Sequence, residues 1–212
     1  LTAGTGLTIS GTTMTTAGLA ALVDDPSPQV GGSAGLDLQA QLLVGNGGTT
    51  GIAIAADGAV TMALQPCVFA ARTSRQTNVT GDGATATVLY NEELFDQGGD
   101  FNVSNGTFTA PLDGRYLVAV GVMLVGFTGV THSDITGNIV ETDRTIKLQH
   151  ESYFATQTKD RIWINATRII NMDSGNTITI QVTVDGESSD VIDIEGSAVS
   201  NVHTSIGVYK VA

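Results

Sequence analysis

The sequence predicts an all-β protein whose larger part is a two-layer sandwich of short antiparallel strands. Glycine is frequent, at 26 residues, and charged residues make up only 14% of the chain, a composition that favours strands and turns over helices. Between Tyr90 and Val120, aromatic and apolar residues recur at the spacing of short strands that reverse at glycine turns. No helical periodicity competes with the strand pattern in this stretch.

Beyond Pro66 the alternation of apolar and polar residues predicts eight main strands, with a short irregular one near residues 191–194. The main strands are expected at residues 67–73, 85–94, 106–110, 115–125, 144–150, 160–171, 177–184 and 205–211. In the strand at 160–171, Trp163 lies on the face opposite Ile162 and Ile164. Trp163 is therefore expected either to pack in a subunit interface or to offer a stacking surface for a sugar.

Residues 1–65 differ from the rest of the chain because they contain no aromatic residue and consist of short stretches of small and apolar residues. Such segments cannot bury a core of their own, so we expect three copies to wind together as a fibre shaft. Residues 16–23 are expected to form a short helix before Pro26, and Asp57 and Gly58 a hairpin turn. The predicted domains are a shaft at 1–65 and a knob at 66–212.

Six residues carry a resemblance to a known family. Tyr90 stands six residues before Asp96, Phe101 and Phe108 follow it at five and twelve residues, and a Gly-x-Tyr follows at Gly114 and Tyr116. In this pattern residues 66–212 resemble a C1q-like domain, a module related to tumour necrosis factor. The chain departs from the family at Val118 and Val120, where aromatic residues are usual, and at Tyr90, where phenylalanine is usual.

The resemblance implies a ten-stranded type of jelly-roll sandwich that assembles as a homotrimer and holds calcium near its axis. In residues 1–65, the stretches 24–32, 36–39 and 52–62 resemble linker and shaft repeats of bacteriophage tail fibres. The departures from the family favour a viral or bacterial protein over an animal one.

The charge balance argues against nucleic-acid binding. The formal net charge is −12, and only 9 lysines and arginines are available to hold a phosphate backbone. No apolar run is long enough to span a bilayer and no signal-peptide pattern is present, so we expect a soluble chain. Cys67 is the only cysteine, which excludes an intrachain disulfide, and we expect it to be a small buried residue.

Antiparallel strands that start from the shaft place alternate loops at the far end of the knob. The predicted far-end loops are residues 74–84, 127–142, 171–176 and 196–204, all rich in Thr, Ser, Asn, Asp and Gly. Candidate receptor-binding residues in these loops are Arg75, Asn78, Asp82, His132, Asp134, Asn138, Asn201 and His203.

Catalysis has little support in the sequence. The three histidines are far apart and no zinc-binding spacing or nucleophile motif occurs, so we expect no enzyme activity. Asp185, Glu187 and Asp190 supply the oxygen ligands that calcium prefers, and the alternative is a polar loop without metal. His132 and His203, with Asp134 two residues from His132, make a weaker case for a transition metal, against a solvated loop.

The leading hypothesis is a homotrimeric receptor-binding tip of a bacteriophage tail fibre, located on the virion outside the cell. Its target is a host surface polysaccharide or an outer-membrane protein, and other virion tail proteins are expected to join it through chain that precedes Leu1. The alternatives are a structural virion or baseplate protein whose knob only forms trimers, a fibre-borne depolymerase and a secreted bacterial C1q-like adhesin.

Overall fold

The computed structural model describes residues 42–44, 51–54, 57–62, 64–127, 132–152 and 160–212. Nearly all regular structure in this part of the chain is β-strand, and one 3-10 turn, η1 (Val199–Asn201), interrupts it. The helix expected at residues 16–23 and most of the expected shaft lie outside the described residues.

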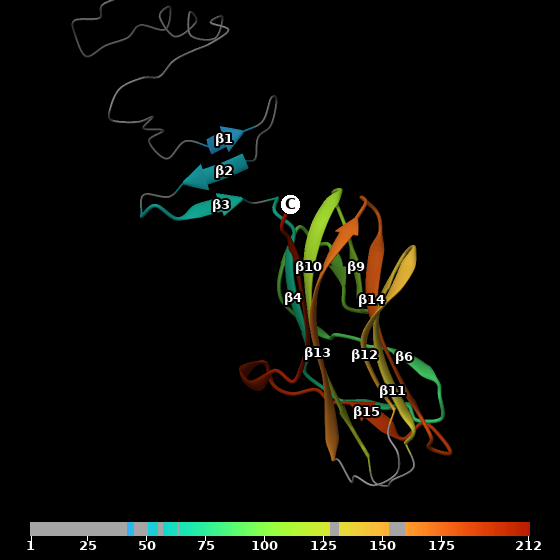
Figure 1. Cartoon of the computed structure of the whole chain (residues 1–212). Coiled ribbons are helices and arrows are strands. Elements are labelled where there is room, and N and C mark those ends of the chain that lie inside the picture. The colour runs from blue at the N-terminus through green and yellow to red at the C-terminus, as the bar shows by residue number, and fades with distance from the viewer. Residues whose placement is uncertain (1–41, 45–50, 55–56, 63, 128–131, 153–159) are drawn as a thin grey trace, which may run out of the picture.

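Two antiparallel sheets face each other from residue 67 onward (Figure 1). The first sheet has the order β13 (Arg161–Met172), β10 (Gly114–Val125), β16 (Thr204–Lys210), β4 (Cys67–Arg72) and β7 (Glu92–Gln97), and the short β5 (Gln76–Thr80) and β15 (Ile192–Ile194) extend it. The second has the order β12 (Arg144–Ser152), β11 (Asp134–Glu141), β14 (Thr177–Asp185), β9 (Thr107–Thr109) and β8 (Phe101–Asn102), and β6 (Thr85–Thr87) also pairs with β14. The chain crosses repeatedly between the sheets, which is the jelly-roll topology that the sequence predicted.

The aromatic residues of the family-like pattern form the centre of the core. Tyr90 packs edge-on against Phe101 with ring centroids 5.8 Å apart, and Phe108 lies 5.6 Å from Tyr116. All four are buried. Asp96 accepts hydrogen bonds from the backbone N–H groups of Asp100 and Phe101, at 3.1 and 2.9 Å, and so shapes the turn before β8.

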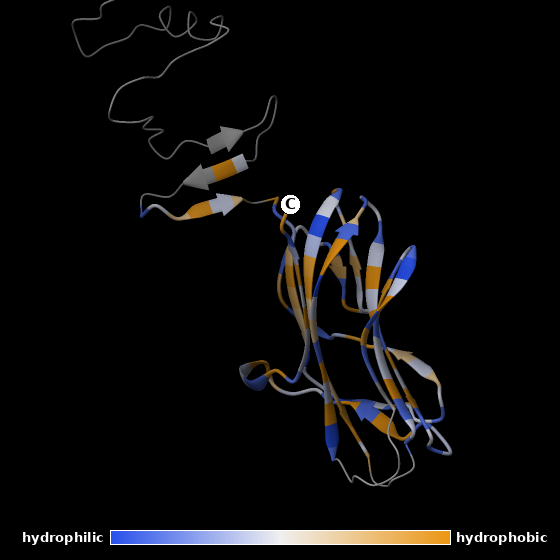
Figure 2. Ribbon diagram, viewed as in Figure 1, coloured by the Kyte–Doolittle hydropathy of each residue, from blue (hydrophilic) through white to orange (hydrophobic). Residues whose placement is uncertain are grey.

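The core is built from alternate residues of each strand. Along β10 the buried side chains are Tyr116, Val118, Val120, Val122 and Leu124. Figure 2 shows the resulting alternation of hydrophobic and hydrophilic residues along the long strands. On β13, Ile162 and Ile164 are buried and Trp163 faces outward, so the predicted division of this strand into two faces is confirmed.

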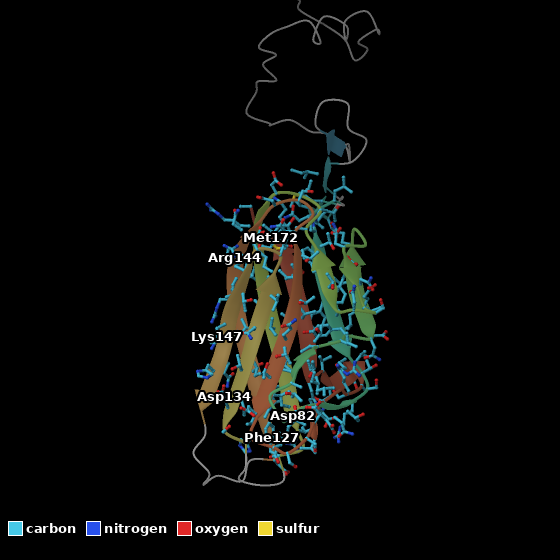
Figure 3. The ribbon with its side chains drawn as sticks, turned by 90° about the vertical axis from the view of Figure 1, so that its right-hand side faces the viewer. Asp82, Phe127, Asp134, Arg144, Lys147 and Met172 are labelled. Carbon is cyan, nitrogen blue, oxygen red and sulfur yellow. The ribbon has the colours of Figure 1, made fainter. Side chains whose placement is uncertain are left out.

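A separate three-stranded meander precedes the sandwich and consists of β1 (Leu42–Val44), β2 (Gly51–Ile54) and β3 (Val60–Met62). Gln97 Nε2 donates a hydrogen bond to the Met62 carbonyl, and Gln65 Nε2 donates one to the Lys210 carbonyl. We call the end of the sandwich at which β4 begins the stem end, and the opposite end the far end. Figure 3 shows Arg144 and Met172 at the stem end, and Asp82, Phe127 and Asp134 at the far end.

Three strands of the sandwich, β5, β8 and β11, were not predicted from the sequence, and the omission of β11 misplaced a loop. The predicted loop at 127–142 contains strand β11, whose buried positions include Gly137. Gly137 and Asn138 resemble a turn, yet a Cβ on Gly137 would lie 2.8 Å from Ile164 Cγ2, so a glycine is needed for the sheets to pack. Because β11 is an additional strand, β12, β13 and β14 run in the opposite direction to the one expected. The loop at 171–176 therefore lies at the stem end rather than the far end.

The other boundaries differ less. The predicted strand at 85–94 is two strands, β6 and β7, which belong to different sheets and are separated by the buried Tyr90. The remaining predicted strands are confirmed with small shifts at their ends.

We predict that Gly137→Ala lowers the free energy of unfolding by about 1–3 kcal/mol, because the new methyl group overpacks the buried Ile164. Urea denaturation at equal protein concentrations measures the effect. Gly207→Ala is the matched control, since the nearest atom to its Cβ would be 3.7 Å away, an ordinary contact distance. Equal stability of the two variants would contradict the packing role of Gly137.

Candidate binding surface at the far end of the sandwich

A buried threonine fixes the first far-end turn. Thr80 Oγ1 accepts a hydrogen bond from the Val184 N–H at 2.8 Å and donates one to the Ala84 carbonyl at 2.5 Å. Gly81 brings this turn against the loop after β14, because a Cβ there would lie 2.5 Å from the Ser189 carbonyl oxygen. The turn at 80–84 and the loop at 186–191 therefore form one packed unit.

A second buried threonine fixes the loop between β15 and β16. Thr204 Oγ1 accepts a hydrogen bond from the Met123 N–H at 3.2 Å and donates one to the Glu195 carbonyl at 2.7 Å. The Glu195 N–H in turn donates to the Met123 carbonyl at 2.8 Å. Residues 195–203 thus cross the end of β10 on the outer face of the first sheet, and Met123 is buried beneath them.

An ionic network joins two of the predicted receptor-binding residues to residues that the sequence did not single out. Arg75 forms ion pairs with Glu195 and with Asp193, the latter at 3.4 Å. The Asn78 N–H donates to Asp193 Oδ1 at 2.7 Å, and Asn78 adopts a left-handed backbone with φ of 52°. Arg75 and Asn78 are exposed, so their side chains are available at the surface.

Acidic residues from two loops meet beside this network. Asp82 adjoins Asp190, and the pKa of Asp190 is raised by partial burial and by the neighbouring Asp82 carboxylate. Asp185 Oδ1 accepts a hydrogen bond from the Gly186 N–H, and the Glu187 N–H donates to the Gly81 carbonyl. Within the described ranges, no three or more His, Cys, Asp or Glu side chains gather to hold a metal ion, so the three candidate calcium ligands are not brought together.

Three other predicted residues have roles in the sandwich. His132 is buried, and its ring meets Phe127 edge-on with centroids 5.0 Å apart. Asp134 begins β11 and pairs with His150 on β12, with Oδ1 to Nε2 at 2.7 Å. Asn138 lies within β11 rather than in a far-end loop, because the predicted loop is a strand. His132 and Asn138 are therefore not surface loop residues.

Asn201 and His203 approach Trp163. The His203 and Trp163 rings meet edge-on, with centroids 5.8 Å apart and an interplanar angle of 87°. Asn201 Nδ2 lies 3.3 Å from His203 Nε2. The three residues come from β13 and from the loop that Thr204 fixes, and the side chain of Trp163 is partly exposed.

A groove of about 680 Å³ runs along the outer face of the first sheet. Small residues form its floor, and aromatic and polar side chains its sides; the lining residues are Phe69, Leu117, Ala119, Val120, Gly121, Asn165, Ala166, Thr167, Ser205, Gly207 and Tyr209. The sequence analysis did not predict this groove. The available signal was the small residues Ala119, Gly121 and Gly207 at outward positions of long strands, where large side chains usually stand.

Comparison with known proteins gives no family by sequence. No family model matches the chain and no curated protein matches it. Solved structures with a similar fold include the globular domain of zebrafish complement 1qA, at 11% identity, a TM-score of 0.46, and coverage of 70% of this chain and 98% of that one. Murine APRIL is also similar, at 11–12% identity and TM-scores of 0.46 and 0.47, over 69% of this chain and 99% of that one.

The jelly-roll assignment rests on the order of the strands in this chain. In the part of the chain that the structure describes, no helix has the length and apolar character needed to cross a membrane.

We predict that Thr204→Val loosens the loop at 195–203, because valine keeps the shape of threonine but removes both buried hydrogen bonds. Loss of one such buried partner costs about 1–3 kcal/mol. Trp163 is the only tryptophan, so a red shift of its fluorescence at low urea reports release of the loop. Thr145→Val, at an exposed site on β12, is the control and should leave both stability and emission unchanged.

Proposed function

We propose that this chain forms a homotrimeric knob at the end of a fibre and attaches a virus particle, most directly a tailed bacteriophage, to its host. The far end of the sandwich meets the cell surface, and the stem end joins the fibre. The chain acts by binding rather than by catalysis. The virion context is supported by the resemblance of residues 24–32, 36–39 and 52–62 to linker and shaft repeats of phage fibres.

The observation that carries this proposal is the unequal distribution of exposed apolar side chains over the two ends. Large apolar residues gather where the chain enters the sandwich, and we call them the stem-end collar: Met62, Leu64, Phe95, Leu112, Ile169, Tyr209 and Val211. Among them Leu64 is 66% and Ile169 64% exposed in the single chain. Contiguous exposed apolar surface of this kind indicates a protein interface.

The charges on two opposite edges of the sandwich favour a second copy of this chain as the partner. The edge formed by β13 and the adjacent β12 carries Lys147 and Arg168, whereas β7 at the other edge of the first sheet carries Glu92 and Glu93. Opposite charges on different edges support head-to-tail contacts, which close into a ring instead of pairing two identical surfaces. The exposed apolar residues of β3 support the same assembly along the fibre.

The far end supports attachment because it presents several polar side chains on loops that are held in place. Exposed side chains there include Arg75, Asn78, Asp82 and Asn201, and the loops that carry them are tied to the sheets by Thr80 and Thr204. A fixed surface loses little conformational freedom on binding. Three copies on one knob, and several fibres on one particle, turn weak single contacts into firm attachment.

We predict that the wild-type chain has a solution mass of three times 21.8 kDa by light scattering. The double variant Ile169→Asp, Tyr209→Asp should fall to the mass of one chain, because charges cannot be buried in the collar contact. Circular dichroism checks that the sandwich is still folded. Thr179→Asp, at an outward position of β14 in the middle of the second sheet, is the control and should remain trimeric. A monomeric wild-type chain would contradict the proposed trimer.

We predict that the labelled chain binds intact cells of a susceptible bacterium and that the double variant Arg75→Ser, Asp82→Ser weakens this binding several-fold, because it removes charged groups that a polar target would contact. Both residues are exposed at the far end and lie outside the strands, whereas an exchange of 131–138 would cut into β11. Asp173→Ser, at an exposed site at the stem end, is the control. A trimer without affinity for any cell would favour the alternative in which the knob only caps the fibre.

A further inference from the structure

Trp163 is an exposed aromatic residue at the far end of the molecule, where the other exposed large apolar side chains are Val191 and Val199. Its side chain is 41% exposed on the outer face of β13, while the stem-end collar contains the exposed Phe95 and Tyr209. Next to Trp163 on the same face stand Asn165 and Thr167, and Gly121 and Ser205 continue this polar half of the groove across β10 and β16. Trp163 is thus set apart from the apolar surface that we assign to the trimer.

The indole ring is held before any ligand arrives. His203 meets Trp163 edge-on at 5.8 Å, and Asn201 lies 3.3 Å from the far ring nitrogen of His203. The loop that carries both residues is fixed to β10 through Thr204 and Glu195. Preorganisation of this kind removes much of the entropic cost of binding.

Polar groups with fixed positions border the exposed ring. Asn165 lies over Gly121, since a Cβ on Gly121 would be 3.2 Å from Asn165 Oδ1. His203 positions the indole, and its own Nδ1 atom is enclosed and lies out of the reach of a ligand. An aromatic face bordered by two amides offers one apolar contact and several hydrogen bonds within one small area.

We propose that Trp163, Asn165, Asn201 and His203 form a stacking site for a neutral hexopyranose of a cell-surface glycan. A pyranose ring presents C–H groups on one face, which pack on the indole, and hydroxyl groups around its rim, which bond to the amides of Asn165 and Asn201, while His203 holds the indole in place. The net charge of −12 and the nearby Asp193 and Glu195, both already paired with Arg75, disfavour an acidic sugar.

This inference rests on the proposed attachment role, since it names the ligand class of the same far end. The first test is fluorescence titration of the full chain with methyl glycosides of glucose, galactose, mannose and N-acetylglucosamine. Because Trp163 is the only tryptophan, its emission reports the site directly. We expect saturable binding of at least one glycoside. No saturable change with any of the four, or an indole that acrylamide cannot reach in the trimer, would overturn the proposal.

Variants make the assignment specific. Asn165→Ala should weaken binding of the glycoside about tenfold, the loss expected for one hydrogen bond. Asn171→Ala lies on the same face of the same strand at the stem end and should bind as the wild type does. Trp163→Ala, followed by saturation-transfer NMR because it removes the fluorophore, should abolish binding while circular dichroism stays unchanged. Equal binding by all three variants would contradict the site.

Cell attachment separates the two proposals. If the chain binds cells and Trp163→Ala binds them equally well, the sugar site is wrong and the attachment role stands. If a glycoside binds at Trp163 but the wild-type chain attaches to no cell, the sugar site stands and the proposed attachment role fails.

Discussion

The structure depends on the pairing of β10 on both of its sides. Its twelve residues pair with β13 along their full length, and β16 and β15 share the opposite side. A strand held in this way cannot slip by one residue without moving its buried side chains to the solvent. The same register therefore fixes the core, the groove on the outer face and the point at which residues 195–203 cross the sheet.

The two ends of the sandwich differ because the outer face of this one sheet changes in character along its strands. Toward the stem end it carries large apolar side chains such as Ile169 and Tyr209, and toward the far end small and polar ones such as Gly121 and Asn165. The alternation of buried and exposed residues does not distinguish the two halves of this face, because outward side chains alternate with core side chains in both. The two halves differ in their exposed side chains: one half offers apolar surface to a partner, and the other offers space and hydrogen-bonding groups.

Much of the sandwich could be predicted because its core residues also carry local signals. Tyr90, Phe101, Phe108 and Tyr116 recur at the spacing of short strands and turns, and all four are buried. Strand β11 could not be predicted from local preference, because its Gly137 is required by Ile164, a residue distant in the sequence. The groove, the Arg75 ion pairs and the contact of Trp163 with His203 also arise between residues that are distant in the sequence. Residue spacing along the sequence does not reveal such contacts.

The first and last strands of the sandwich are neighbours, and this has a mechanical consequence. β4 receives the chain from residue 66 and pairs with β16 on one side and with β7 on the other. Hydrogen bonds between antiparallel strands run perpendicular to the strands. Tension applied along β4 through the preceding chain therefore loads these bonds together, in shear, instead of opening them one after another. A tethered sandwich of this design resists pulling best in the direction from which its chain enters.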